Sequence, residues 1–118
     1  MPATAFQRID VETVEGVVVV TCRDKKIIEI SRIKEMALEL FQLAEQGNPR
    51  ILLDFVGVDF MSSAFLSWLI NLERRISAKN GKLVLCNVRS EIYEVFAITK
   101  LSRLFSICDA RERALQVF

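Results

Sequence analysis

The chain has 118 residues, the size of one ordinary domain, and 52% of them are apolar, which is enough for one sizeable core. Its 16 Lys and Arg side chains nearly balance 15 Asp and Glu, so charge gives no reason to expect nucleic acid or an anionic membrane as a partner. The chain has no histidine, and its three cysteines show no CxxC spacing. Histidine-based catalysis and the common zinc motifs are therefore excluded, and we expect neither a metal nor a cofactor.

The same sequence bears on the compartment. No apolar run approaches the roughly 20 residues that cross a bilayer. The opening residues, MPATAFQRID, lack the basic stretch and following apolar run of a secretory signal. Cys22, Cys86 and Cys108 lie in or at the end of apolar runs, which is typical of free thiols in a reducing compartment. We expect a cytoplasmic protein that does not contact membrane.

The first half of the chain predicts a hairpin and a helix. Residues 6–22 form two strand-like stretches around a Glu15-Gly16 turn. The second stretch, VVVVTC, is so uniformly apolar that we expect cover on both of its faces. Apolar residues then recur at helical spacing over residues 30–44, and the sequence GNP a few residues later contains the expected stop signals.

The second half alternates strands and helices. The expected elements are a strand over 50–58, a helix over 62–79, a strand over 82–88, a helix over 90–101 with Ser90 as its N-cap, a strand over 104–108 and a helix over 109–118 whose Asp109 and Glu112 are spaced as a capping box. This order predicts a single α/β domain over residues 1–118. Its mainly parallel central sheet follows an N-terminal β-hairpin and carries about four helices.

Two adjacent serines, Ser62 and Ser63, open the second predicted helix. A helix N-cap explains one of them, because a serine oxygen accepts a hydrogen bond from a free N–H of the first turn. A hydroxyl just beyond the carboxyl end of a parallel strand is also exposed and firmly placed. Phosphorylation there would add nearly two negative charges, which a helix N-terminus tolerates. The residues alone leave both roles open.

The helix after this pair has an apolar arc of about 200 degrees, wider than an ordinary surface helix needs. The helix is therefore buried on most sides or has an exposed apolar flank. Aromatic residues often anchor interfaces, so an exposed face of Phe65, Trp68 and Leu72 would permit a homodimer.

Three segments carry a family resemblance: RILLDFVGVDFMSSAFLSWL, GKLVLCNV and EIYEVFAITKLSRLFSI. They resemble the STAS domain, in particular bacterial anti-sigma factor antagonists, over nearly the whole chain. The family pattern, an apolar strand ending in Asp and then Asp-Ser-Ser/Thr-Gly-Leu-Gly, is matched by Asp54, Ser63 and Leu66. The later family pattern is matched by Val95, Phe96, Thr99, Leu101, Phe105 and Ile107. The chain departs from the first pattern at Ser62, Ala64, Phe65 and Ser67.

The resemblance implies a regulatory phosphoprotein of bacterial transcription that has no catalysis of its own. In such antagonists a GHKL-type serine kinase, which is also the anti-sigma factor, phosphorylates the first motif serine, and a phosphatase restores it. Ser63 is then the expected acceptor, with Ser62 as a backup, and the unphosphorylated protein binds the kinase. The residues expected at the partner surface are Asp24, Ser62, Ser63, Phe65, Leu66, Trp68 and Asn87. Asp24 and Asn87 fit structural turn roles as well.

Two other functions stay open. The chain could be a scaffold subunit of a transporter or signalling assembly, in which the serines only cap a helix. It could also bind a small ligand in a dry apolar pocket near Trp68. An enzyme is not expected, because Ser63 has no histidine and Asp59 is only its sequence neighbour. Likewise, the spacing from Cys86 to Arg89 is too short for an anion-binding loop.

Overall fold

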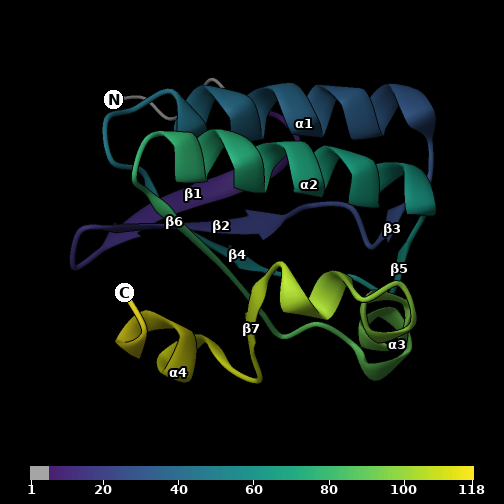
Figure 1. Cartoon of the computed structure of the whole chain (residues 1–118). Helices are drawn as coiled ribbons and strands as arrows, with labels where there is room; N and C mark the ends of the chain where they lie inside the picture. The colour runs from purple at the N-terminus through teal and green to yellow at the C-terminus, as the bar shows by residue number, and fades with distance from the viewer. Residues whose placement is uncertain (1–5) are drawn as a thin grey trace.

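The computed structural model describes residues 6–118, so the first five residues of the stretch used to judge a secretory signal lie outside it. A five-stranded sheet has the order β1-β2-β4-β6-β7 (Figure 1). Its strands are β1 (Ile9–Val14), β2 (Val17–Cys22), β4 (Arg50–Asp54), β6 (Lys82–Cys86) and β7 (Ser106–Cys108). Only β1 and β2 are antiparallel, and every other pair is parallel.

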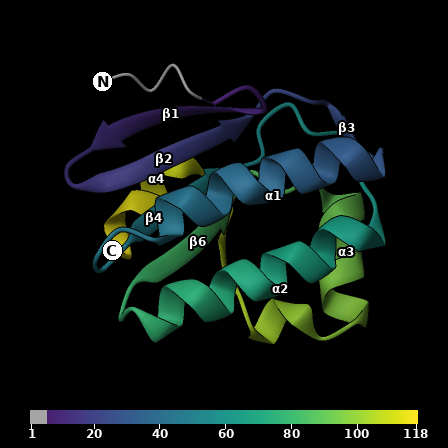
Figure 2. The same ribbon diagram turned by 90° about the horizontal axis from the view of Figure 1, so that it is seen from above.

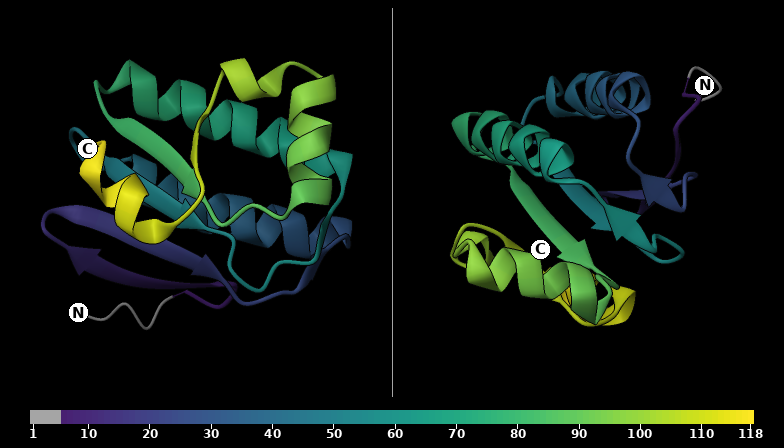
Figure 3. Two further views of the ribbon diagram at one scale, coloured as in Figure 1. Left: turned by 90° about the horizontal axis from the view of Figure 1, so that it is seen from below. Right: turned by 90° about the vertical axis from the view of Figure 1, so that its right-hand side faces the viewer.

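Four α-helices surround the sheet: α1 (Ile30–Ala44), α2 (Ser63–Ala78), α3 (Ser90–Ile98) and α4 (Arg111–Gln116). α1 and α2 lie side by side on one face (Figures 1 and 2). Seen from below, α4 covers the other face near the C-terminus, and α3 stands at the far end of the molecule (Figure 3). The fold class predicted from the sequence, including the hairpin and the mainly parallel sheet, is confirmed.

The sheet separates two apolar clusters. The larger lies under α1, α2 and α3, and the smaller lies under α4. The residues of β2 alternate between them, because Val20 belongs to the larger cluster while Val17 and Val19 belong to the smaller. The predicted cover on both faces of this strand is confirmed. Each fully buried aliphatic side chain contributes about 1.5–3 kcal/mol, so these clusters supply most of the driving force. Within residues 6–118, no helix has the length and apolar character to cross a bilayer.

Three local predictions were wrong. The strand predicted over 50–58 ends at Asp54. The loop after it leads to β5 (Phe60–Met61), which pairs with β3 (Lys26–Ile27) in a separate two-stranded sheet. Ser90 is the first residue of α3 rather than its N-cap, which is Arg89. The capping box at the last helix does not form, because the N-cap is Ala110. Asp109 instead lies 3.7 Å from Arg113 in an exposed ion pair.

The end of α2 is fixed by a backbone motif that the sequence did predict. Asn80 adopts a left-handed φ of 58°, and the Gly81 N–H donates to the Ile76 carbonyl at 2.8 Å. The next residue, Lys82, donates its N–H to the carbonyl of Pro49 at 2.8 Å. The turns before β4 and β6 are therefore packed against each other.

This packing leaves no room for a side chain at Gly81. A Cβ there would overlap the Pro49 carbonyl oxygen and lie 2.8 Å from Pro49 Cγ and Cδ. We expect Gly81→Ala to lower the free energy of unfolding, measured by urea denaturation, by about 2–3 kcal/mol. Gly47→Ala is the matched control, because nothing lies within 4 Å of its Cβ position. A change equal to that control would contradict the close approach.

Candidate functional site

The carboxyl edge of the sheet is organised around one buried carboxylate, Asp54, which is only 2% exposed. Its Oδ1 accepts hydrogen bonds from the Val56 N–H at 3.0 Å and from Asn87 Nδ2 at 2.9 Å. Its Oδ2 accepts a bond from Arg111 Nε at 2.9 Å. Three donors from three segments therefore satisfy this charge. The result fits the general rule that buried charges are paired and hydrogen-bonded.

Opposing effects act on the Asp54 carboxyl. Burial raises its pKa, but the bonds from Asn87, Val56 and Arg111 outweigh burial and hold the pKa below its ordinary value. The network also extends to the edge of the sheet, since Arg111 Nη1 lies 3.0 Å from Glu12 Oε1. Asp54 is thus ionised at neutral pH and joins α4 and β6 to the loop after β4.

Arg111 was missed in the sequence. It lies in the first turn of α4, where an acidic residue is normally favoured by the helix dipole. That mismatch was the available signal that Arg111 serves a partner elsewhere. Asn87, in contrast, was expected at this edge in either a partner or a turn role. Its φ of 55° and its bond to Asp54 give it a structural role.

The loop after Asp54 leads to the serine pair and is held on both sides. The Asp59 N–H donates to the Lys25 carbonyl at 2.7 Å, and the Ser62 N–H donates to the Ile27 carbonyl at 2.9 Å. These bonds extend the β3–β5 pairing up to the start of α2. Ser63, the first residue of α2, is therefore firmly placed, and it is exposed.

The two serines differ in access. Ser62 is the N-cap residue by position, yet its hydroxyl makes no capping bond. Its Oγ is buried and has no hydrogen-bond partner among the described residues. The predicted capping bond is therefore not formed by Ser62. The prediction of Ser62 as a backup acceptor is also wrong for this conformation, because a kinase cannot reach a buried oxygen.

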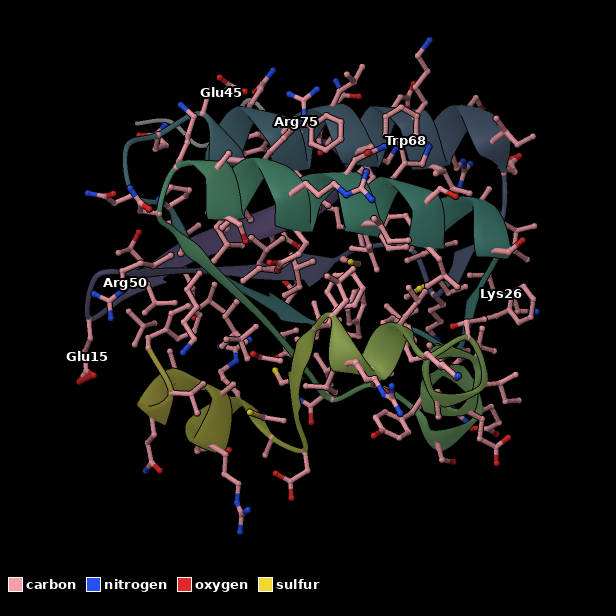
Figure 4. All side chains as sticks on the ribbon, in the orientation of Figure 1. Glu15, Lys26, Glu45, Arg50, Trp68 and Arg75 are labelled. Carbon is pink, nitrogen blue, oxygen red and sulfur yellow. The ribbon has the colours of Figure 1, made fainter. Side chains whose placement is uncertain are left out.

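Apolar side chains are exposed in the segments that adjoin this helix start. Ile28 and Ile30 follow β3, and Ile30 is 77% exposed. Phe60 of β5 is 50% exposed and forms one wall of a groove of about 90 Å³, whose other walls include Leu66 and Val95. Figure 4 shows that Lys26 lies near the same end of α2. Exposed large apolar side chains that gather on adjoining segments are typical of interaction sites.

Two of the aromatic predictions have different outcomes. Phe65 is fully buried and packs edge-on against Phe55, with ring centroids 6.5 Å apart. The prediction that Phe65 faces a partner is wrong, because the side chain points into the core. Trp68 is half-buried and packs against Phe41, with ring centroids 5.6 Å apart (Figure 4). Leu72 is also buried, so the face proposed for a homodimer is not exposed.

Two further residues predicted at the partner surface, Leu66 and Asp24, make contacts within the molecule. Leu66 is largely buried but lines the groove beside β5. The side chain of Asp24 lies 3.9 Å from Arg8 and 3.8 Å from Arg32, so it is engaged within the molecule. In residues 6–118 no group of three or more His, Cys, Asp and Glu is placed to hold a metal ion.

Comparison with known proteins decides the family. The sequence model of the STAS domain matches residues 8–114. The chain belongs to the STAS domain family. BtrV of Bordetella bronchiseptica, a proposed anti-sigma factor antagonist, is 23% identical over 94% of each chain.

Solved STAS structures have the same fold. An anti-sigma-factor antagonist domain protein from Planctomyces limnophilus is 23% identical, with a TM-score of 0.81 over 92% of this chain and 96% of its own. Phosphorylated SpoIIAA of Bacillus is 18% identical, with a TM-score of 0.70 over 93% of this chain and 99% of its own. The mouse anion transporter Slc26a9 contains a similar part, with 14% identity and a TM-score of 0.74 over 90% of this chain and 18% of its own.

The depressed pKa of Asp54 predicts an acid-sensitive fold. A carboxyl with a lower pKa in the folded state stabilises the protein above its unfolded pKa, and that stability is lost as pH falls through the folded pKa. We expect Asp54→Asn to lower the free energy of unfolding by about 2–4 kcal/mol at neutral pH, with a smaller difference below about pH 4. Urea denaturation across pH measures both. Asp59→Asn, at an exposed ion pair, should change stability by under about 1 kcal/mol.

Because the Ser62 hydroxyl has no hydrogen-bond partner among the described residues, replacing it should affect stability differently from replacing an ordinary N-cap serine. Replacing a capping serine by alanine usually costs about 1 kcal/mol. Because the Ser62 Oγ has no partner to lose, Ser62→Ala should leave the free energy of unfolding unchanged or raise it slightly. A loss of about 1 kcal/mol or more in urea denaturation would mean that the hydroxyl caps α2 in solution.

Proposed function

We propose that this STAS protein is an anti-sigma factor antagonist that is switched by phosphorylation of Ser63. In the unphosphorylated form it binds an anti-sigma factor that is also a GHKL-type serine kinase, and a serine phosphatase reverses the modification. The observation that carries the proposal is the exposed position of Ser63 at the start of α2, next to segments that bear exposed apolar side chains. The family membership and the likeness to anti-sigma factor antagonists support it.

These exposed apolar side chains supply the attraction for a partner. The exposed Ile28 and Ile30 follow β3, which pairs with β5. Phe60 of β5 and Val95 of α3 are also exposed and line one groove. Covering such side chains removes apolar area from water, which is worth about 25 cal/mol per Å² before the costs of association. Nearby charge is locally balanced, since Arg89 Nη1 lies 3.0 Å from Asp59 Oδ1. Binding is therefore driven by apolar contact rather than by a strong field.

Phosphate on Ser63 would reverse this balance. It adds about 1.5–2 negative charges at neutral pH. A partner that covers the neighbouring apolar side chains would have to remove water from these charges. The fold would tolerate the charge, because α2 begins at Ser63 and has no side-chain cap over its free N–H groups. The modification thus weakens binding without unfolding the protein, which is what a reversible switch needs.

A scaffold role is the second candidate. The transporter Slc26a9 contains a part of the same fold, so a STAS domain can serve as a fixed portion of a larger protein. In that role Ser63 would carry no phosphate, and partner binding would not depend on it. A complex that survives purification unchanged with Ser63→Ala and with Ser63→Asp would favour the scaffold. The small-ligand alternative stays a prediction, and the Trp68 ring itself packs on Phe41.

The first test is phosphopeptide mapping of the protein isolated from its own cells. Trypsin releases residues 51–74 as one peptide that contains Ser62, Ser63 and Ser67. We expect mass spectrometry to find phosphate on Ser63 in a fraction of the molecules, because only this hydroxyl is both exposed and fixed at the helix start. Phosphate should disappear in Ser63→Ala.

Ser67→Ala is the matched control, because Ser67 is also exposed and lies one turn further along α2. It should leave the phosphopeptide at its normal level. An unmodified peptide across several growth and stress conditions, or phosphate on Ser67 alone, would contradict the switch.

A further inference from the structure

Cys86 and Cys108 lie opposite each other on neighbouring parallel strands. They are register partners in the β6–β7 pair, and both side chains belong to the apolar cluster on the α4 face. Neighbouring strands lie about 4.8 Å apart, which is within the Cα separation of about 4.4–6.8 Å that a disulfide spans. The third thiol, Cys22, packs against the larger cluster on the opposite face. The sheet therefore separates Cys22 from this pair.

The two paired thiols differ in access to solvent. Cys86 is buried, whereas Cys108 is half-buried. Cys108 also lines an open hollow of about 330 Å³ together with Val88 and Tyr93. A small oxidant in that hollow reaches the half-buried Cys108 before the buried Cys86, which does not line the hollow. Burial and the neighbouring Asp54 raise the pKa of Cys86 to about 12, so Cys86 is a protonated thiol in the resting protein.

We propose that Cys86 and Cys108 form a dithiol site that hydrogen peroxide oxidises to an intramolecular disulfide. In the first step the Cys108 sulfur attacks peroxide, an S–O bond forms and the O–O bond breaks. The departing hydroxide takes the Cys108 proton and leaves as water. In the second step the Cys86 sulfur attacks the Cys108 sulfenic acid, an S–S bond forms, and the S–O bond breaks. The departing hydroxide takes the Cys86 proton as a second water. Overall, two thiols are oxidised and one peroxide is reduced to two waters.

The disulfide would form within the Asp54 network. Asn87, which donates to Asp54, follows Cys86 directly, and Arg111, the other side-chain donor, is three residues beyond Cys108. The bond would therefore tie together the two strand ends from which these donors extend.

The test uses the purified full chain, treated with hydrogen peroxide and then with an alkylating reagent. We expect the intact mass, before alkylation, to fall by about 2 Da, the mass of two hydrogen atoms. The number of alkylated thiols should fall from the three free cysteines to one. After trypsin, residues 83–89 should be linked to residues 104–111, while the peptide 9–23 that holds Cys22 is alkylated. Dithiothreitol should restore three thiols.

The three cysteines provide matched variants. Cys22→Ser should keep the 2 Da loss, whereas Cys86→Ala and Cys108→Ser should abolish it, as judged on samples with native circular dichroism. If Cys86→Ala does not fold, Cys108→Ser at the half-buried edge position gives the same answer. The proposal is overturned if peroxide leaves three thiols, if it only adds oxygen to Cys108, or if the link joins Cys22 or two chains. None of these readouts depends on phosphorylation of Ser63.

Discussion

The fold depends on satisfying the buried charge of Asp54. An unpaired carboxylate at this depth would cost several kcal/mol, so the segments that supply its donors must be in place together. Those segments are the loop at Val56, the end of β6 at Asn87 and the start of α4 at Arg111. The Asp54 side chain therefore joins the loop after β4, the residue that follows β6 and the first turn of α4 at the carboxyl edge of the sheet.

The same carboxylate is what gives the serine site its rigidity. The Val56 N–H donates to Asp54 Oδ1 and so bends the chain directly after β4, and Gly57, with a φ of 85°, allows the turn to continue. The chain then pairs with β3 and enters α2. The start of α2 at Ser63 is thus connected to Asp54 through the turn at Val56 and the β3–β5 pairing.

Sequence patterns predicted the parts of this structure that depend on apolar periodicity. The hairpin, the ends of α1 and the position of β6 follow from spacing and from turn residues, and Asn80-Gly81 ends α2 as expected. The patterns failed where tertiary contacts outweigh local preference. The two-residue strands β3 and β5 are too short to show periodicity, and the partner of Arg111 is 57 residues away. Ser62 has the right residue type for a cap, but its side chain is turned inward.

The inward orientation of two residues also explains how this fold accommodates departures from the family motif at the start of α2. Phe65, which stands where the family has a glycine, packs against Phe55 and adds to the core rather than to the partner surface. Ser62, which stands where the family has an aspartate, buries its Oγ. Of the four departures, only Ala64 and Ser67 are exposed, and both are small. The surface around Ser63 is therefore shaped mainly by the neighbouring β3, β5 and α3 segments. Under the proposed function, a partner would therefore be recognised through those segments.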